Sequence, residues 1–450
     1  IDNTFASPVN QNPIDFGIDI VIHSATKYMG GHSDICAGAV AGSREDVDRI
    51  FQLAKNLGGS LSDYTVWLLE RSLKTMGIRV APSTGGKLDY YRFLVDNGVL
   101  KRIKRHVVGR NRRYFIVSPP GFENLCLKEL LSLPLTAHNA SVIPGGLEFV
   151  GRLHDCYLAN LYLRTANRIL MRICQIKAAN FKELEKRASE VPWELFLQPN
   201  AQPKIHTTAR HCRLYHTDAV RQRVLARISN YWSKKTFSRK KRNPTRSDIT
   251  IFVRGADDRF TVSVDSSGNH LHKRGLKRHY GKAPLRETQA AAALLLAGYN
   301  GREPLLDPLC GTGTFSLEAA LMVKNIPPGW FRKFGFMHWP SFSRKRWEYL
   351  KHQCAKQFGR PPKPVIFASD QDISACNRLK KCIRQNHLSD AITVRRKNFF
   401  EFLPGDVVDQ TGIVVINPPY GMRLGSLEKS KQLFGAICDQ LNQAYKGWKV

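Results

Sequence analysis

Two short motifs, each directly after an apolar stretch, hold the residues best suited to chemistry. Asn417 begins the sequence Asn-Pro-Pro-Tyr, which follows the apolar run 412–416 and ends at Tyr420. An exocyclic amine is a poor nucleophile because its lone pair conjugates with the ring, so alignment supplies most of the catalysis. The Asn417 side-chain oxygen and the Pro418 carbonyl can accept hydrogen bonds from such an amine, while Tyr420 offers a ring face to an unstacked base. The motif predicts a site that grips a nucleobase.

The second motif begins at Asp307, reads Asp-Pro-Leu-Cys-Gly-Thr-Gly-Thr, and lies about 110 residues earlier in the chain. We expect a strand to end here and a helix to begin. Gly311 and Gly313 would let the backbone approach a ligand closely, and the first turn of the helix would offer free amide donors. Alone, such a turn could be an ordinary strand-to-helix connection. Together the two motifs predict methyl transfer from S-adenosylmethionine to a nucleobase nitrogen.

Both motifs require strands that end at the same edge of one sheet. From Glu287 onward, helical and strand patterns alternate, which is typical of a doubly wound parallel sheet. Asp370 follows the strand expected at 365–368 and could accept both ribose hydroxyls of a nucleoside. A helix cap is the alternative for Asp370 alone, and Asp372 could cap the helix that starts at Ile373.

The region before this sheet has the mixed periodicity of a small α+β RNA-binding unit. Strands are expected at 114–117, 147–150, 204–208, 250–253 and 260–264, and helices at 121–131, 155–167, 181–190 and 218–232. The segment 325–360, rich in Trp, Phe and Pro, is expected as an insertion near the site.

The net charge of +32 is distributed unevenly. Residues 1–80 hold seven Lys/Arg and nine Asp/Glu, whereas the other 370 residues hold 62 and 28. This asymmetry predicts an anionic polymer as partner of the larger part, and two unrelated pieces joined together. The basic stretches 219–247 and 266–286 contain no acid, although either alone could be a solvated face. The residues expected to bind RNA are Lys234, Lys235, Arg239, Lys240, Lys241, Arg242, Lys273 and Arg274.

The remaining composition narrows the class of protein. The ten cysteines form no CxxC pair or His/Cys cluster, so we expect reduced thiols in the cytoplasm and no metal. No apolar run approaches the roughly 18–20 residues of a membrane span. An apolar content of 42% is typical of globular chains.

Further motifs lie in the same order as those of a known family. His272-Lys-Arg-Gly275, Ala283-Pro-Leu-Arg-Glu-Thr288 and Phe115-Ile-Val-Ser-Pro-Pro-Gly-Phe-Glu123, with the two motifs above, resemble the THUMP-containing bacterial rRNA guanine-N2 methyltransferases. The resemblance covers about 113–450. It implies a ferredoxin-like plus THUMP region at 113–268 that holds RNA, and a Rossmann-like S-adenosylmethionine methyltransferase domain at 269–450. The implied substrate is guanine N2 in large-subunit (23S) rRNA.

The resemblance also assigns roles to individual residues. It implies that Asn417, Pro418 and Tyr420 hold the base, and that a second set lines the cofactor: Asp307, Gly311, Gly313 and Asp370. Asn398 stands where this family commonly has an acidic residue that contacts adenine. Because the sequence ends at Val450, soon after the helix that follows the 417–420 motif, we expect the final sheet strands to be absent.

A different chemistry is indicated near the beginning of the chain. Lys27 follows a strand expected at 18–22 and is flanked by the hydroxyls of Ser24 and Thr26. Such a lysine suits covalent attachment of pyridoxal phosphate, with the hydroxyls on the phosphate and Asp2 on the pyridinium nitrogen. A surface lysine is otherwise simply solvated.

Residues 1–80 resemble the Cys/Met-metabolism pyridoxal-phosphate enzymes of the cystathionine synthase and lyase type. The resemblance implies an α/β fragment of a fold-type I domain, with helices expected at 44–55 and 64–76, joined to the rest through a linker at 81–112. The ring-stacking aromatic and the phosphate loop of that family would precede this segment, so we expect the fragment not to hold the cofactor alone. Two other functions therefore remain open: a transsulfuration-type lyase, and an RNA-binding module whose catalytic domain is inactive.

Overall fold

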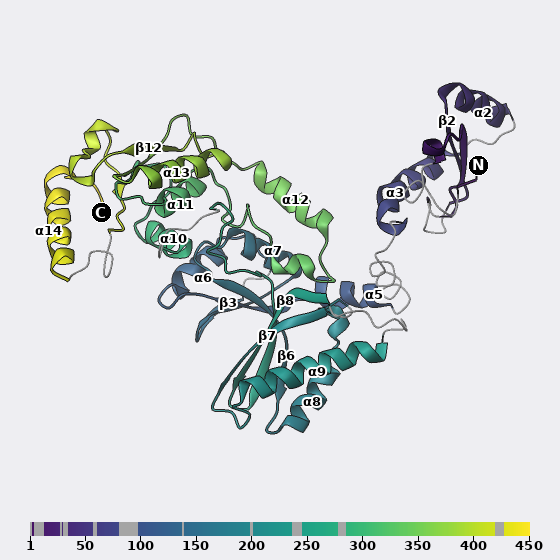
Figure 1. The fold of residues 1–450 in the computed structure, drawn as a ribbon. Helices are drawn as coiled ribbons and strands as arrows, with labels where there is room; N and C mark the ends of the chain where they lie inside the picture. The colour runs from purple at the N-terminus through teal and green to yellow at the C-terminus, as the bar shows by residue number, and fades with distance from the viewer. Residues whose placement is uncertain are drawn as a thin grey trace. The chain divides into compact units, whose positions relative to one another are not determined.

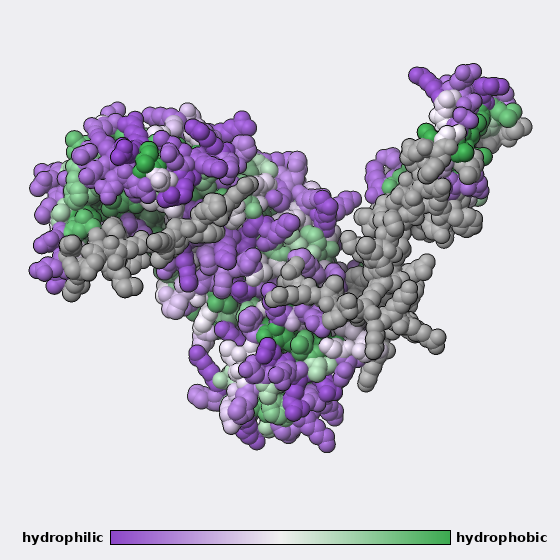
Figure 2. Space-filling view, in the orientation of Figure 1, coloured by the Kyte–Doolittle hydropathy of each residue, from purple (hydrophilic) through white to green (hydrophobic). Residues whose placement is uncertain are grey.

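The computed structural model separates residues 1–100 from residues 101–450 as two units (Figure 1). The structure describes residues 2–3, 13–27, 29, 35–56, 61–80, 98–136, 139–198, 201–235, 245–277, 285–418 and 427–450. Of this part of the chain, no helix is both long and apolar enough to cross a membrane. The face seen in Figure 2 carries mostly hydrophilic residues.

A four-stranded parallel sheet forms the carboxyl-terminal half of the larger unit and confirms the expected fold class. Its order is β12 (Ile392–Arg396), β11 (Ile366–Asp370), β10 (Leu305–Asp307) and β13 (Ile413–Val414). The longest strands have five residues. Because all four run the same way, the residues after each strand gather at one edge of the sheet.

Both faces of this sheet are buried, as a doubly wound arrangement requires. Leu305 and Ile413 pack into one core, together with residues of α10 (Glu287–Leu296), α11 (Thr314–Val323) and α13 (Ile373–Gln385). Leu306 and Val414 point into a second core that contains Ile437 of α14 (Leu427–Ala444). The two-residue alternation of the strands thus supplies one core to each side.

The aromatic segment between α11 and β11, expected as an insertion near the site, also packs against the preceding half of the larger unit. It contains η4 (Gly335–His338) and α12 (Arg344–Ala355). Phe336 and Trp347 lie against Tyr157 of the preceding half, with ring centroids 4.4 and 6.0 Å away. The aromatic richness of this insertion therefore serves to join the two halves of the larger unit.

A seven-stranded sheet forms the first half of the larger unit. Its adjacent strands pair antiparallel, except for the parallel pair β7 and β8. In sheet order the strands are β4 (Ala140–Ile143), β5 (Gly146–Gly151), β3 (Arg112–Val117), β6 (Arg168–Lys177), β9 (Arg259–Asp265), β8 (Thr245–Ala256) and β7 (Ala201–Arg210). Five of these strands confirm expected ones. The central strand β6 is not among the expected strands, and α7 (Leu153–Tyr162) ends five residues before the expected helix end at Asn167.

The helices of this half pack on one face of the sheet. One cross-strand row shows this face clearly: Tyr114, Met171, Val264, Ile251 and Ile205 are paired in register and all are buried. The packing helices are α6 (Glu123–Leu131), α7, α8 (Phe181–Glu190) and α9 (Thr217–Lys235). The opposite face carries alternate, mainly polar residues such as Arg172 and His206.

The smaller unit is built from few elements in its described part. Two antiparallel strands, β1 (Ile20–Ser24) and β2 (Gly38–Gly42), form its sheet. Its long helices are α2 (Arg44–Asn56) and α3 (Asp63–Val80), close to the expected bounds. After them, α5 (Val99–Ile103) and a π-helical turn (Lys104–Val108) occupy the end of the expected linker.

Candidate active site

The end of β10 is tied to the first turn of α11 by a buried carboxylate. Asp307 is the last residue of β10 and is 1% exposed. Its Oδ2 accepts hydrogen bonds from the Ser316 amide at 3.2 Å and the Ser316 hydroxyl at 2.7 Å. Burial raises the pKa of Asp307 to about 6, against the lowering effect of these two bonds. The Asp307 side chain therefore connects the end of β10 to the first turn of α11 and stabilises the turn between them.

The two glycines have different reasons to lack a side chain. Both have positive φ, 52° at Gly311 and 70° at Gly313, which favours glycine. A Cβ on Gly313 would lie 2.4 Å from the Leu379 side chain, so this glycine allows α11 to pack closely on α13. A Cβ on Gly311 would meet nothing within 4 Å. The backbone at Gly311 therefore faces open space, as a ligand-cradling turn should.

Asp370 lies at the end of β11, beside this open turn. Its Oδ2 accepts a hydrogen bond from the Gly311 amide at 2.8 Å, and its Oδ1 accepts one from the Asp372 amide at 2.9 Å. Asp372 caps α13 by accepting from the Ser374 amide at 2.7 Å, which confirms the cap expected there. The two neighbouring acids thus have separate tasks.

Asn398 follows β12, the next strand along the sheet. Its side-chain oxygen accepts a hydrogen bond from the Phe400 amide at 3.2 Å and begins a short 3-10 helix, Phe399–Glu401. The side chain therefore has a local structural partner at the same edge of the sheet where Asp370 lies.

The register of β13 places Asn417 at that edge as well. Ile413 pairs with Leu305 and Val414 with Leu306, and the Val415 amide donates to the Leu306 carbonyl at 2.9 Å. Asn417 follows two residues later, and both it and Pro418 are partly buried. The tetrapeptide and the glycine turn therefore extend from neighbouring parallel strands. Tyr420 lies outside the described residues.

An apolar hollow adjoins Pro418. A cavity of about 580 Å³ lies between this residue and α14, whose Leu433, Phe434 and Ile437 line it. Its volume exceeds that of a single nucleobase several-fold.

The described residues contain no group of three or more His, Cys, Asp or Glu placed to hold a metal ion.

A lysine that the sequence reasoning did not single out reaches the glycine turn. The Lys277 Nζ donates to the Thr314 hydroxyl at 2.7 Å and lies 3.4 Å from the Thr312 hydroxyl. Burial lowers the pKa of Lys277, while the nearby Glu287 carboxylate acts in the opposite sense. Its position three residues after Arg274, in the basic stretch 266–286, was the available indication. The lysine adds a cation to the amide donors at the start of α11.

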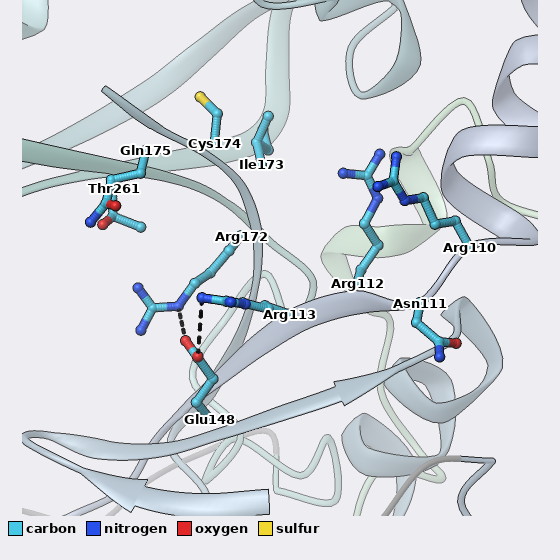
Figure 3. A pocket seen from close by; sticks show the side chains of 10 residues that line it. All are labelled: Arg110, Asn111, Arg112, Arg113, Glu148, Arg172, Ile173, Cys174, Gln175 and Thr261. Atoms are coloured by element: carbon cyan, nitrogen blue, oxygen red, sulfur yellow. Dashed lines mark ion pairs between the residues drawn. The ribbon is translucent and has the colours of Figure 1, made fainter. Parts of the chain in front are cut away.

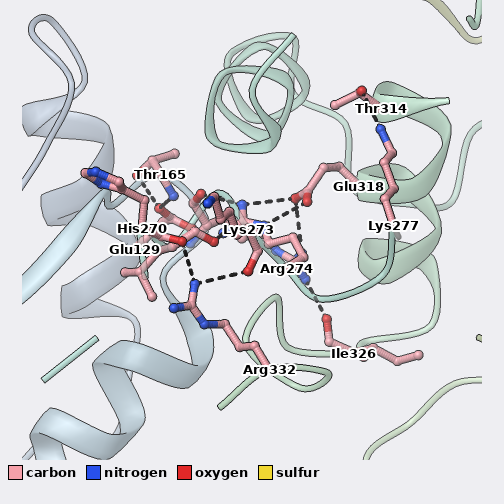
Figure 4. Close-up of polar contacts among 12 residues, drawn as sticks. Glu129, Thr165, His270, Lys273, Arg274, Lys277, Thr314, Glu318, Ile326 and Arg332 are labelled. Carbon is pink, nitrogen blue, oxygen red and sulfur yellow. Dashed lines mark hydrogen bonds and ion pairs between the residues drawn. The ribbon is translucent and has the colours of Figure 1, made fainter. Parts of the chain in front are cut away.

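Arg274 was expected to bind RNA, and the structure corrects this expectation. The residue is 2% exposed, and its Nε donates to Glu318 Oε1 at 2.9 Å (Figure 4). The Arg274 Nη2 also donates a hydrogen bond to the Arg164 backbone carbonyl at 2.7 Å. The Arg164 side chain itself lies 4.0 Å from Glu318. Ion pairing within the interior therefore removes Arg274 from the RNA-binding set, whereas Lys273 is exposed.

The other residues expected to bind RNA are described incompletely. Lys234 and Lys235 end α9, and nothing is described of their side chains. The run from Arg239 through Lys240 and Lys241 to Arg242 lies outside the described residues.

The residues expected to bind pyridoxal phosphate all lie in the described part of the smaller unit: Asp2, Ser24, Thr26 and Lys27. Lys27 is exposed, and the Thr26 hydroxyl both donates to and accepts from the Ala37 backbone, at 3.2 and 2.9 Å. Burial lowers the pKa of His23, and the adjacent Asp2 carboxylate partly opposes this effect. Ser24 is the last residue of β1. The Thr26 hydroxyl, one of the two expected on the phosphate, is therefore bonded to the backbone in this structure.

Three family models match successive parts of the larger unit. Models of an RlmL ferredoxin-like domain, a THUMP domain and an RMKL-like methyltransferase domain match residues 113–170, 178–265 and 274–450. A Synechocystis protein named "Putative RNA methyltransferase" is 32% identical over 339 residues, which cover 75% of this chain and 87% of that protein. The chain belongs to the RlmL-like THUMP methyltransferase family.

Other relatives in the RlmL-like family are longer. A ribosomal RNA large subunit methyltransferase K/L of Methylococcus capsulatus is 32% identical over 346 residues, and the chain spans 46% of its length.

A solved structure from Listeria monocytogenes, described as a predicted N6-adenine-specific DNA methylase, shares 29% identity with a TM-score of 0.67, covering 78% of this chain and 88% of that one.

Two further comparisons concern a bound cofactor product in a solved relative and the amino-terminal segment of this chain. The solved structure of SMU.472, a methyltransferase complexed with SAH, shares 26% identity with a TM-score of 0.65 and covers 75% of this chain and 88% of that one. The model that matches residues 274–450 is thus that of a methyltransferase domain, and one solved relative of this fold contains SAH. Residues 1–105 match the model of Cys/Met metabolism PLP-dependent enzymes.

Proposed function

We propose that this chain transfers a methyl group from S-adenosylmethionine to the exocyclic N2 of a guanine in large-subunit ribosomal RNA. The supporting observation is the alignment of three strand ends. Asp370 and Asp307 end the parallel strands β11 and β10, and Asn417 follows their neighbour β13. A nucleoside cofactor and a nucleobase could therefore be held side by side along one edge.

The residues around the glycine turn suit S-adenosylmethionine, which supplies a methyl group activated by its sulfonium. The open backbone at Gly311 would admit the ligand, and the Asp370 carboxylate would accept the ribose hydroxyls. Lys277 and the free amides at the start of α11 would hold the methionine carboxylate. Asn398 would meet the adenine.

The target base would be held from the other side. The Asn417 side-chain oxygen and the Pro418 carbonyl would accept hydrogen bonds from the amino group and so fix the nitrogen in line with the methyl donor. Because these two acceptors are held in place before the reaction, they favour the sp³ character that develops at the nitrogen. Tyr420 would stack on the base once it has left its helix.

RNA, rather than DNA, is favoured by the first half of the larger unit. A THUMP domain and a ferredoxin-like domain precede the methyltransferase domain, and residues 81–450 carry 34 more Lys/Arg than Asp/Glu. Phosphate contacts alone do not distinguish the two polymers. The methylated nucleoside therefore has to be identified directly.

The decisive experiment is tritiated-methyl transfer onto undermethylated ribosomal RNA, with a DNA duplex assayed in parallel. We expect label on RNA, recovered as N2-methylguanosine after digestion. Asn417→Ala should lower the rate at least about 100-fold, because one oriented acceptor is lost, while SAH still binds. Asn442→Ala, an exposed change on α14, serves as the matched control.

Each alternative outcome is distinct. N6-methyladenine in either polymer would replace the guanine proposal. RNA binding without label would mean that the chain acts as a binding module. Release of an α-keto acid from cystathionine would support the lyase.

A further inference from the structure

The face of the seven-stranded sheet opposite its helices, here called the open face, concentrates positive charge. It is defined by alternate residues that share one side of the strands: Arg113, Arg172, Lys204, Arg210, Arg254 and Arg259. All are exposed except Arg172, which is partly so. These residues come from five strands that are spread through the sequence, so no charged run in the chain marks them.

Two guanidinium groups of the open face lie over one aromatic ring. The Cζ atoms of Arg172 and Arg254 are 5.0 and 5.2 Å from the centroid of Phe115. Arg254 belongs to β8 and Phe115 to β3, so its side chain reaches across the intervening strands β9 and β6 along the sheet surface. Held in this way, a guanidinium group presents an outer planar face on which a base can stack.

A second pair of planar groups lies farther along the same row. His206 and Phe252 are cross-strand partners, with ring centroids 5.2 Å apart and an angle of 22° between the rings. His206 is exposed on one side. The open face therefore presents planar groups at two positions.

The charge on this face is poorly balanced by acids. Burial and the like charges of Arg172 and Arg210 lower the pKa of Arg254. Glu148 pairs with Arg172 and approaches Arg113 at 3.9 Å. Glu148 is the one acid among the residues that line a cavity of about 320 Å³, and the lining also includes Arg110 and Arg112 (Figure 3). Crowding of like charges is unfavourable unless an anion is bound between them.

We propose that the open face binds an unpaired RNA strand. The lysine and arginine side chains hold its phosphates, while His206 and the guanidinium planes of Arg172 and Arg254 stack its bases. A duplex would offer phosphates to the cations but no free base faces to these planes. The inference rests on the proposed RNA methyl transfer and adds where the strand is held.

The test is fluorescence anisotropy with a labelled, unstructured 12-nucleotide RNA at a series of salt concentrations. One variant is Arg210→Gln/Arg254→Gln. A second, Lys204→Gln/Arg259→Gln, removes the same charge from side chains that are not packed on Phe115. The matched control is Lys182→Gln/Lys186→Gln on α8, whose side chains are exposed on the helix side of the same sheet.

Each open-face variant should bind at least 10-fold more weakly and lose about 1.4 from the slope of log affinity against log salt, because two phosphate contacts disappear from a single strand. The control should stay within twofold of the parent protein. His206→Ala should weaken binding about fivefold or more with the slope unchanged, as expected for loss of stacking.

Several results would overturn the proposal. These are parental binding in both open-face variants, an equal loss in the α8 control, or a preference of the parent protein for a duplex of the same length. Methyl transfer is assayed in parallel to separate the two proposals. If the parent protein methylates RNA while the open-face variants bind normally, only the location of the strand is wrong. If it binds through the open face but methylates nothing, only the catalytic proposal fails.

Discussion

The two units of this chain carry motifs of similar specificity on very different scaffolds. Lys27 follows a strand of a two-stranded sheet, and β2, its partner, contains no buried residue. The glycine turn follows β10, in which all three residues are buried between two cores. The comparison teaches that a motif can perform its chemistry only where the surrounding elements hold its backbone.

The helices repeat this contrast. Helix α2 has no buried residue, and Tyr64 and Trp67 of α3 are 68% and 56% exposed. In α11, by comparison, the first eight residues are all buried. The smaller unit therefore has little apolar burial with which to offset the entropy of ordering a site.

The largest expected effect is a loss of stability confined to the larger unit. Glu318→Gln leaves Arg274 buried without its countercharge and should lower the free energy of unfolding of this unit by about 3–5 kcal/mol. Denaturant unfolding followed by tryptophan fluorescence would measure it. Glu348→Gln removes an exposed pair with Arg344 and should leave stability nearly unchanged, because solvent screens the pair. Equal losses in the two variants would contradict this account.

The next effect depends on pH. The pKa of Asp307 is raised in the folded protein to about 6 from an ordinary value of 3.8. Its contribution to stability is therefore complete below about pH 4 and is lost as the pH rises through about 6. The difference in unfolding free energy between the parent protein and Asp307→Asn should fall by about 3 kcal/mol at most over this range. A difference independent of pH would show that the carboxyl group is not perturbed.

A smaller effect sharpens the assignment of the cofactor site. Asp370→Asn should weaken SAH binding by about 2 kcal/mol, roughly 30-fold, because a charged acceptor of two hydroxyls becomes neutral. Titration calorimetry would measure the change. Asp372→Asn preserves a capping side chain and should leave the affinity unaltered. If both variants lose affinity equally, the role of Asp370 is structural.

The smallest effect concerns the lysine of the smaller unit. Because Lys27 is exposed, Lys27→Ala should change neither methyl transfer nor the free energy of unfolding by more than about 0.5 kcal/mol. Pyridoxal phosphate added to the parent protein should produce no absorbance band that the variant lacks. A Lys27-dependent band would show that the fragment retains its cofactor site.

Short-range chemistry explains what could be predicted from the sequence. The glycine turn, the cap at Asp372 and the strand before Asn417 each depend on a few adjacent residues. Arg274 and Lys277 could not be assigned in the same way. Their partners, Glu318 and Thr314, lie 44 and 37 residues away and are brought near only by packing. Strand β6 could not be predicted in this way either, because its apolar residues do not alternate: Ile169, Leu170 and Met171 are consecutive.

The Glu318 ion pair has a mechanical consequence. Helix α11 begins at the cofactor turn, and one turn further along, Glu318 is bonded to Arg274, which in turn grips the Arg164 carbonyl between α7 and β6. The first half of the larger unit and the glycine turn are thus linked through a buried ion pair. A load applied to β6 by a bound polymer would reach Gly313 through five residues of helix.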